Sequence, residues 1–290
     1  MELYNWMVEP FQAGFQIRAL FGGLLAAVMS SFVGVWLVLR GMSFFGDAFV
    51  HGVVPGIAAA VLFDFSPFLG AALAALVMVS LLELIHRTTS LKEDSAIGLL
   101  FVGMMALGVV LISRSDSFQG SLTAILFGDA LGVSWADVGV QLMFVVGVGL
   151  MSLLLYRPLM ALSFSPDKSQ ALGMRPQLTH WLLLLMIAAA VIGSFQAVGT
   201  LLVLGLLIGP AAAAALITRT VPRMILTSLL LGMISVTVGL ILSYHLGTAA
   251  GASMALVAIL GFFVILTIRE TVAAIVRRKR STTLVEQGAS

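Results

Sequence analysis

Long apolar runs alternate with short polar stretches along almost the whole chain. A membrane-spanning helix needs about 20 mostly apolar residues, and each of these runs approaches that length. The runs cover residues 19–39, 47–63, 68–85, 95–113, 137–156, 179–196, 198–217, 223–244 and 252–268. This pattern predicts an all-α fold, a polytopic transmembrane helical bundle of about nine spans in a single domain, 1–290.

Two features leave the count open between eight and ten spans. The run 47–63 is short and contains Pro55 and Gly56. The runs 179–196 and 198–217 form one nearly unbroken apolar stretch, which can fold as a tight helical hairpin or as a broken segment. Residues 114–136 are too polar for a span, and we expect an outer loop with a short surface helix there.

The composition agrees with a membrane protein. The 290 residues are 60% hydrophobic and 10% charged, with a mean hydropathy of +1.13. Soluble domains carry roughly 25% charged residues, so a soluble chain of this length could not bury so much apolar surface. The sequence has no cysteine, which excludes disulfides, thiolate metal sites and cysteine nucleophiles.

Basic residues predict the orientation of the bundle. With the N-terminus outside and nine alternating spans, all but Arg18 and Arg114 of the 15 Lys and Arg residues fall on the cytoplasmic side. Residues 1–18 are then an amphipathic lead-in at the outer interface. The loop 157–178 and the tail 270–290 are cytoplasmic, and the last ten residues are expected to be disordered.

Asp47 and His51 are the conspicuous ionisable residues inside a span, where charge is costly and usually functional. Their i, i+4 spacing puts a carboxylate and an imidazole on one helix face, where they can bind a divalent transition metal. The alternative is that Asp47 caps the helix N-terminus while His51 makes an ordinary hydrogen bond. We expect Glu83, His86 and His180 to be interfacial.

Two further segments have both a functional and a structural interpretation. Pro55 and Gly56 break a span, either where backbone lines a cavity or as a simple kink. In the loop 157–178, residues 167–173 predict a short helix after Pro166 that stops at Gly173. Such a helix can dock onto a soluble motor protein, or it can be a connector lying on the membrane.

The run Leu39–Gly56, with Gly46, Asp47, His51 and Pro55 in order, resembles the signature of the zinc/manganese/iron ABC-importer permeases, the ABC-3 family. A second block, 199–212, which contains Gly209 and Pro210, is similar to another block of that family. Asp167, Ala171 and Gly173 resemble its cytoplasmic coupling loop. The similarity covers essentially the whole chain.

This resemblance implies a permease of the type II ABC-importer kind in a bacterial inner membrane. The expected assembly is a homodimer with two cytoplasmic ATP-binding subunits and an extracytoplasmic metal-binding protein. Asp47 and His51 would be transient ligands of the transported metal, and no permanent cofactor is implied. Relatives often have an acidic residue where this chain has His245, and a nitrogen ligand there favours zinc over manganese as cargo.

The sequence leaves rival functions open. It lacks a GxxxxGK[ST] phosphate loop, so it is not expected to hydrolyse ATP itself, and no nucleic-acid partner is expected. A manganese- or iron-specific permease of the same type is one alternative, and an ion-coupled secondary metal transporter is another. An intramembrane metalloenzyme would need catalytic histidines, but the sequence contains no HExxH motif. A purely structural membrane subunit would leave the Asp47–His51 pair unexplained.

Overall fold

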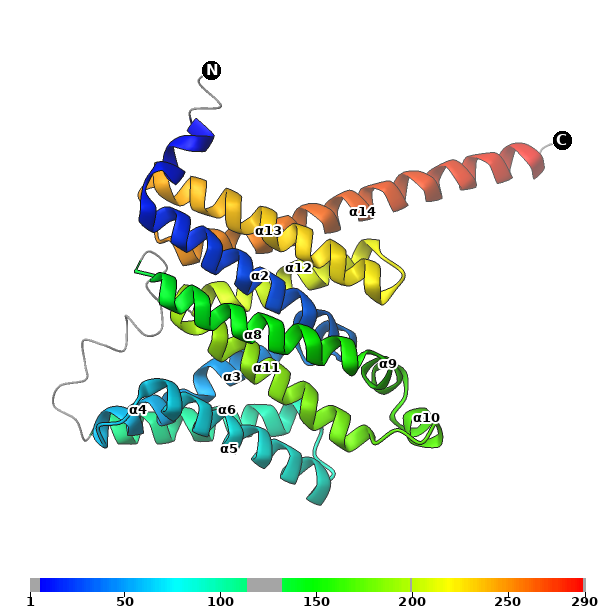
Figure 1. The fold of residues 1–290 in the computed structure, drawn as a ribbon. Helices are drawn as coiled ribbons and strands as arrows, with labels where there is room; N and C mark the ends of the chain where they lie inside the picture. Colours follow the sequence, from blue (N-terminus) through cyan, green and yellow to red (C-terminus); the bar gives the residue numbers. More distant parts are fainter. Residues whose placement is uncertain (1–5, 114–131, 199, 289–290) are drawn as a thin grey trace.

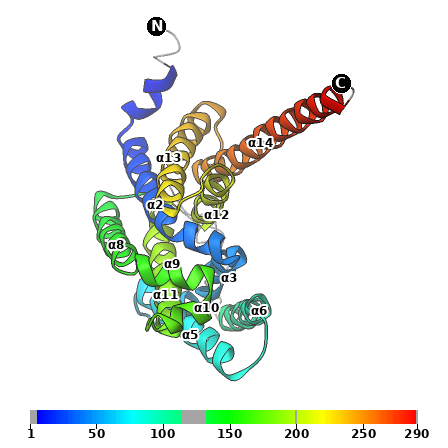
Figure 2. The same ribbon diagram turned by 90° about the vertical axis from the view of Figure 1, so that its right-hand side faces the viewer.

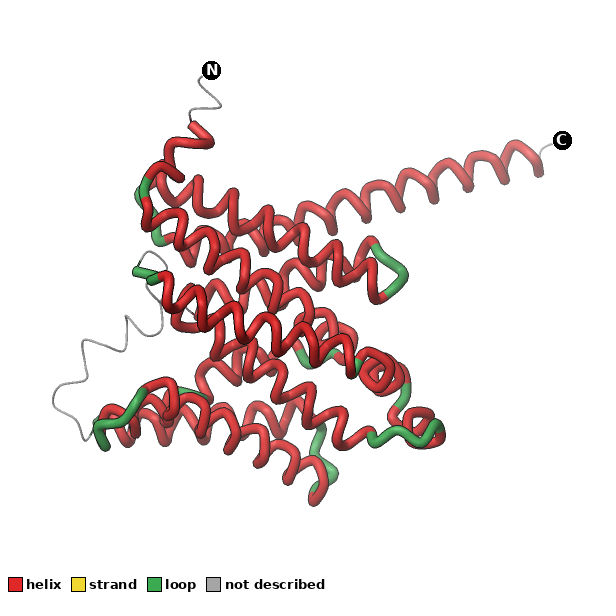
Figure 3. The backbone as a smooth tube through the Cα atoms, viewed as in Figure 1, coloured by secondary structure: helices red, strands yellow, loops and turns green. Residues whose placement is uncertain are grey.

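The computed structural model describes residues 6–113, 132–198 and 200–288. Every regular element in these residues is a helix (Figure 3). In chain order they are η1 (Glu9–Gln12), α2 (Gly14–Arg40), α3 (Ser43–Gly52), α4 (Val54–Leu62), α5 (Pro67–Thr88), α6 (Glu93–Ile112), α8 (Trp135–Leu154), α9 (Tyr156–Phe164), α10 (Pro166–Ala171), α11 (Pro176–Val198), α12 (Thr200–Ile217), α13 (Val221–Leu246) and α14 (Ala250–Gly288).

The helices confirm the predicted membrane bundle. Among the described residues, eight segments are long and apolar enough to cross a membrane, and the shorter apolar helix Leu202–Ile217 in α12 makes a ninth. The residues Phe44–Leu62, in α3 and α4, count as one of the eight. Helix η1 and the far end of α14 lie toward opposite ends of the bundle, as an odd number of crossings requires (Figure 1).

Close helix packing depends on small residues at a few positions. Gly34 of α2 lies against the carbonyl of Leu207 in α12, where an added Cβ would overlap that oxygen. A Cβ on Gly209 of α12 would lie 3.2 Å from the carbonyl oxygen of Ala258 in α14. These contacts let backbones approach closely, which is how helices associate in lipid without a hydrophobic driving force between them.

The outward surface is suited to lipid. Large apolar side chains on α5, α6, α8 and α14 are more than half exposed, among them Leu73, Leu99, Leu153 and Val264. Such continuous apolar exposure is far beyond what a soluble surface carries. Polar side chains instead face inward: the Gln141 amide, for example, donates a 3.0 Å hydrogen bond to the Gly22 carbonyl of α2.

One end of the bundle carries α9, α10 and the connection between α12 and α13 (Figures 1 and 2), and we name it the α10 end. The expected loop 157–178 is largely helical there, because α9 covers its first part and α10 the residues up to Ala171. The tail is also helical rather than disordered, since α14 continues to Gly288 and projects away from the other helices. Most of the expected outer loop 114–136 lies outside the described residues.

Candidate functional site

The short helix α3 follows directly after the end of α2 at Arg40. Gly41 adopts the left-handed conformation, with φ of 70°, and its N–H bonds back to the Val38 carbonyl, a frequent C-terminal stop. Helix α3 then starts at Ser43 and gives way at Val53 to α4, which has Pro55 in its first turn. Asp47 therefore lies inside α3, and the interpretation of this residue as an N-cap is wrong.

Asp47 and His51 do lie side by side on α3. The carboxylate Oδ1 of Asp47 is 3.8 Å from Nε2 of His51, and their side chains are 38% and 28% exposed. Two ligand bonds of about 2.1 Å at a tetrahedral angle place their donor atoms about 3.4 Å apart. Small side-chain rotations would thus let both atoms bind one ion.

Asp47 stands at the edge of an apolar groove between α3, α12 and α14. The groove has a volume of about 690 Å³, and among the described residues that line it Asp47 is the one ionisable side chain. The other lining residues are Phe44, Leu204, Gly205, Ile208, Ala252, Ala255, Leu256 and Ile259. A carboxylate beside such a surface keeps its affinity for a cation, because few other polar groups compete for it.

His51 faces the neighbouring helix α6. Its ring packs edge-on against Phe101, with ring centroids 5.6 Å apart, and Phe44 packs against the same phenyl ring at 6.1 Å. Phe101 therefore supports both the imidazole and the wall of the groove.

In the part of the chain that the structure describes, no third ligand joins this pair. Among the described residues, no group of three or more His, Cys, Asp or Glu side chains is arranged to hold a metal ion. His245, at the end of α13, stacks on Trp6 with ring centroids 4.4 Å apart, and its Nε2 is 2.9 Å from the Trp6 carbonyl oxygen. The structure gives His245 a local packing role and does not bring it to Asp47 and His51.

The other residues of the two signature blocks have packing contacts. Gly56 of α4 lies against the backbone of Gly70 in α5, where a Cβ on either glycine would overlap the other's carbonyl oxygen. Pro55 is buried at the start of α4, and Pro210 is buried inside α12. Together with Gly209, they set how closely neighbouring helices pack, and their side chains carry no ligand atom.

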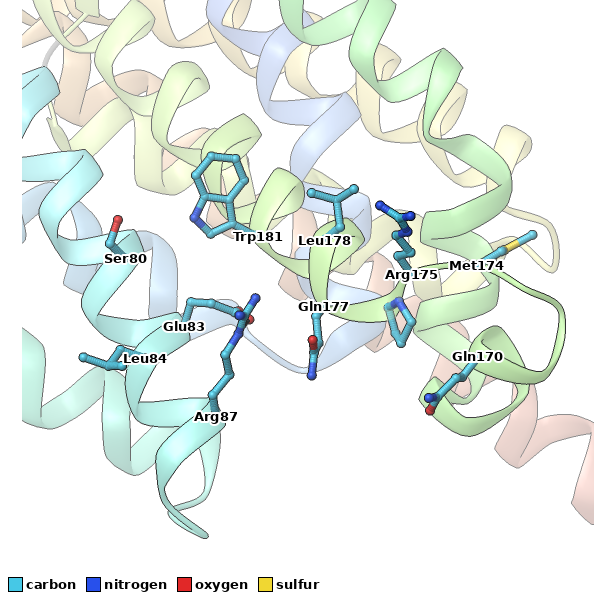
Figure 4. Close-up of a pocket in the computed structure, with 11 residues that line it drawn as sticks. Ser80, Glu83, Leu84, Arg87, Gln170, Met174, Arg175, Gln177, Leu178 and Trp181 are labelled. Carbon is cyan, nitrogen blue, oxygen red and sulfur yellow. Dashed lines mark hydrogen bonds and ion pairs between the residues drawn. The ribbon is translucent and has the colours of Figure 1, made fainter.

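At the α10 end, a cleft of about 620 Å³ separates α5 from the junction of α10 and α11. Figure 4 shows Glu83 and Arg87 on α5 across this cleft from Gln177 and Trp181 on α11. Arg87 Nε donates a 2.7 Å hydrogen bond to Glu83, whose side chain is only 7% exposed. Glu83 is thus buried within the protein, near the C-terminal end of α5.

The short helix predicted in the inner loop is present as α10. Its backbone covers Asp167 and ends at Ala171, and Gly173 follows in the left-handed conformation with φ of 73°. The N–H of Met174 bonds back to the carbonyl of Ser169, which closes the helix end. Ala171 and Gly173 are both exposed.

His180, which we expect at the interface, lies in the second turn of α11 and is buried among neighbouring helices. Its side chain is 5% exposed, with Nε2 3.3 Å from Oε1 of Glu93, the first residue of α6. Nη2 of Arg40, the last residue of α2, is 3.7 Å from the other carboxylate oxygen of Glu93. We call Arg40, Glu93 and His180 together the Glu93 node. The sequence analysis does not predict this node, although its three ionisable residues lie at the ends of three apolar runs.

The fold and the site define a multi-pass, all-helical membrane transport subunit. The model of the family described as "ABC 3 transport family" matches residues 12–269, so the chain belongs to this family of ABC transporters. It is a permease subunit and is not itself an ATPase.

Similar proteins support the same assignment. The chain is 37% identical over 241 residues to the manganese transport system membrane protein MntC of Halalkalibacterium halodurans, covering 83% of this chain and 82% of that one. It is 32% identical to the chelated iron transport system membrane protein YfeD of Yersinia pestis, covering 96% and 93%. The solved structure of PsaBC from Streptococcus pneumoniae in complex with Fab has a similar chain, with a TM-score of 0.79, 30% identity and coverage of 91% and 95%.

Proposed function

We propose that this chain is the membrane-spanning permease of an ATP-driven importer for a divalent transition metal, with Asp47 and His51 as ligands of the passing ion. The observation that carries the proposal is the pair itself. A carboxylate oxygen and an imidazole nitrogen lie 3.8 Å apart beside an otherwise apolar groove. Two ligands are too few for a permanent site, which suits an ion that must be released.

A homodimer would complete the ligand set. The described residues of one chain offer two donors, whereas transition metals take four to six, so a second copy facing the groove would double the number. The groove between α3, α12 and α14 is open and apolar, and a second copy is the occupant that would also cover it. We place the ion path on the axis between the two copies, with two cytoplasmic ATP-binding subunits and an extracytoplasmic metal-binding protein completing the importer.

The α10 end is the cytoplasmic end in this proposal. The basic side chains Arg87, Arg157, Arg175, Arg219 and Arg223 are all exposed there, as the excess of positive charge on the cytoplasmic side requires. The segment with Asp167, Ala171 and Gly173 is then the contact for the ATP-binding subunit. Exposure of Ala171 and Gly173, and the tight helix end at Gly173, support a rigid docking element.

The cargo is proposed as manganese or iron before zinc. The argument for zinc rests on His245, and this imidazole is held by Trp6 rather than by the Asp47–His51 pair. The similar proteins are named for manganese and for chelated iron. A mixed oxygen and nitrogen donor set is compatible with all three divalent ions. Uptake of Mn²⁺ in competition with Zn²⁺ would therefore show which of these two ions the permease prefers.

The test is accumulation of Mn²⁺ by cells that express this permease with its ATPase and binding protein. Even outer-shell partners of a metal site cost 10–100-fold when lost, so Asp47→Asn and His51→Ala should each reduce uptake by about 100-fold. Asp64→Asn is the matched control, because this residue lies in the exposed turn between α4 and α5. Normal uptake by Asp47→Asn at normal expression would exclude the proposed path, and uptake that persists without ATP would favour a secondary transporter.

A further inference from the structure

Glu93 joins three helices at the α10 end. It is the first residue of α6, and its carboxylate lies between Nη2 of Arg40 at 3.7 Å and Nε2 of His180 at 3.3 Å. Arg40 ends α2, and His180 lies in the second turn of α11. The ring of His86 on α5 is centred 5.5 Å from that of His180, so four helices meet around this carboxylate.

This node is buried but incompletely paired. His180 and Arg40 have side chains only 5% and 13% exposed, and Glu93 is 24% exposed. Within the described residues, both ring nitrogens of His180, Nε and Nη1 of Arg40, and Oε1 of Glu93 make no hydrogen bond. Buried polar atoms are normally satisfied, so a cluster that leaves several unsatisfied needs an explanation beyond packing.

The node lies between the α10 segment and the Asp47–His51 pair. Only residues 172–175 separate α10 from α11, so a displacement of α10 is passed to the first turns of α11, where His180 lies. Eight residues beyond Glu93, about 12 Å along α6, Phe101 packs against His51 and Phe44. The helix α6 therefore contacts the node at its first residue and the His51 ring further along.

We propose that Glu93 is a positioning residue that couples movement of the α10–α11 segment to the orientation of His51, through α6 and Phe101. The inference rests on the proposed metal path. When α10 moves, the contact between Glu93 and His180 carries α6 with α11, and the phenyl ring of Phe101 changes the position of the imidazole. Release of the ion from the Asp47–His51 pair is thereby linked to events at the α10 end.

The experiment measures Mn²⁺ transported per ATP hydrolysed, in proteoliposomes that contain the permease with its ATPase and binding protein. Coupling substitutions change equilibria by factors up to about 30, so Glu93→Gln should lower this ratio about tenfold while ATP hydrolysis continues. Asp94→Asn is the matched control. It removes the same charge from the same first turn of α6, but from an exposed side chain that has no ion pair in the described residues.

A purely structural role for Glu93 predicts a different pattern. It would lower the amount of folded protein and leave the ratio of metal to ATP unchanged, and that result would overturn the proposal. Glu93→Asp, which keeps the charge, should restore part of the ratio. If Glu93→Gln does not fold, Phe101→Leu provides the test, because this change leaves the contacts of Glu93 intact. A normal ratio of metal to ATP in Phe101→Leu would overturn the proposal, and a lowered ratio would support it.

A double substitution tests whether both residues belong to one route. Glu93→Gln combined with Phe101→Leu should reduce the ratio no more than the stronger single change, whereas multiplied effects would mean separate routes and contradict the proposal. The proposed function fails separately, if Asp47→Asn leaves Mn²⁺ transport intact. Loss of transport in Asp47→Asn with normal coupling in Glu93→Gln would refute only the role of Glu93.

Discussion

Two ion pairs in this chain have the same i, i+4 helical spacing but different surroundings. Glu83 and Arg87 on α5 are 2.7 Å apart, and Glu83 is buried although it lines the cleft between α5 and α11. Asp47 and His51 on α3 are 3.8 Å apart, and both side chains are about one-third exposed. The first pair makes a charge-assisted hydrogen bond, whereas the second is too long for one.

The difference separates a structural pair from a pair that can bind a third partner. In the Glu83–Arg87 pair the guanidinium donates a hydrogen bond to the carboxylate. Removal of Arg87 leaves the buried Glu83 charge without this donor, and removal of Glu83 leaves Arg87 without this contact. In the Asp47–His51 pair neither group satisfies the other, so both retain their capacity to bind a cation. Equal sequence spacing therefore predicts proximity, but only the distance and the burial distinguish the roles.

The largest expected difference between the pairs is in stability. Arg87→Ala leaves the Glu83 carboxylate buried without its donor, so it should lower the free energy of unfolding by about 2 kcal/mol. The loss is smaller than for a fully buried pair, because the Arg87 side chain is 52% exposed. Asp47→Asn should change it by less than about 0.5 kcal/mol. Denaturant unfolding of the purified permease in detergent measures both.

Arg157→Ala is the control for loss of a basic side chain, because Arg157 is exposed on α9 and has no ion pair in the described residues. Arg87→Lys should recover part of the loss, since it retains the charge without the guanidinium geometry. Equal stability of Arg87→Ala and Asp47→Asn would remove the distinction between the two pairs.

The sequence predicted the bundle and the Asp47–His51 pair because both follow from local periodicity. Runs of about 20 apolar residues specify spans, and i, i+4 spacing specifies proximity on a helix. Contacts between distant segments have no such signal. His245 and Trp6 are 239 positions apart, and the burial of His180 depends on how α2, α6 and α11 meet. The sequence alone therefore does not show which distant side chains these residues contact.

A smaller effect is expected from metal binding to the folded protein. At ten times the dissociation constant, a ligand that binds only the native state stabilises it by about 1.4 kcal/mol. Mn²⁺ should therefore raise the unfolding free energy of wild type and of Arg87→Ala by this amount, but not that of Asp47→Asn. The same titration with Zn²⁺ compares the two ions, and stabilisation of Asp47→Asn by Mn²⁺ would place the metal elsewhere.

The smallest effect is expected at His245, which resembles the Glu83–Arg87 pair in having its own partner. Its ring stacks on Trp6 with an interplanar angle of 9°, and its Nε2 is 2.9 Å from the Trp6 carbonyl oxygen. His245→Ala should lower the unfolding free energy by about 0.5 kcal/mol because the stack is exposed, and His245→Phe should recover most of it. Both variants should transport Mn²⁺ within about twofold of wild type, as expected for an exposed surface contact. If both variants lose as much Mn²⁺ transport as Asp47→Asn, the His245 imidazole lies on the ion path, because phenylalanine keeps the stacking but has no ligand atom.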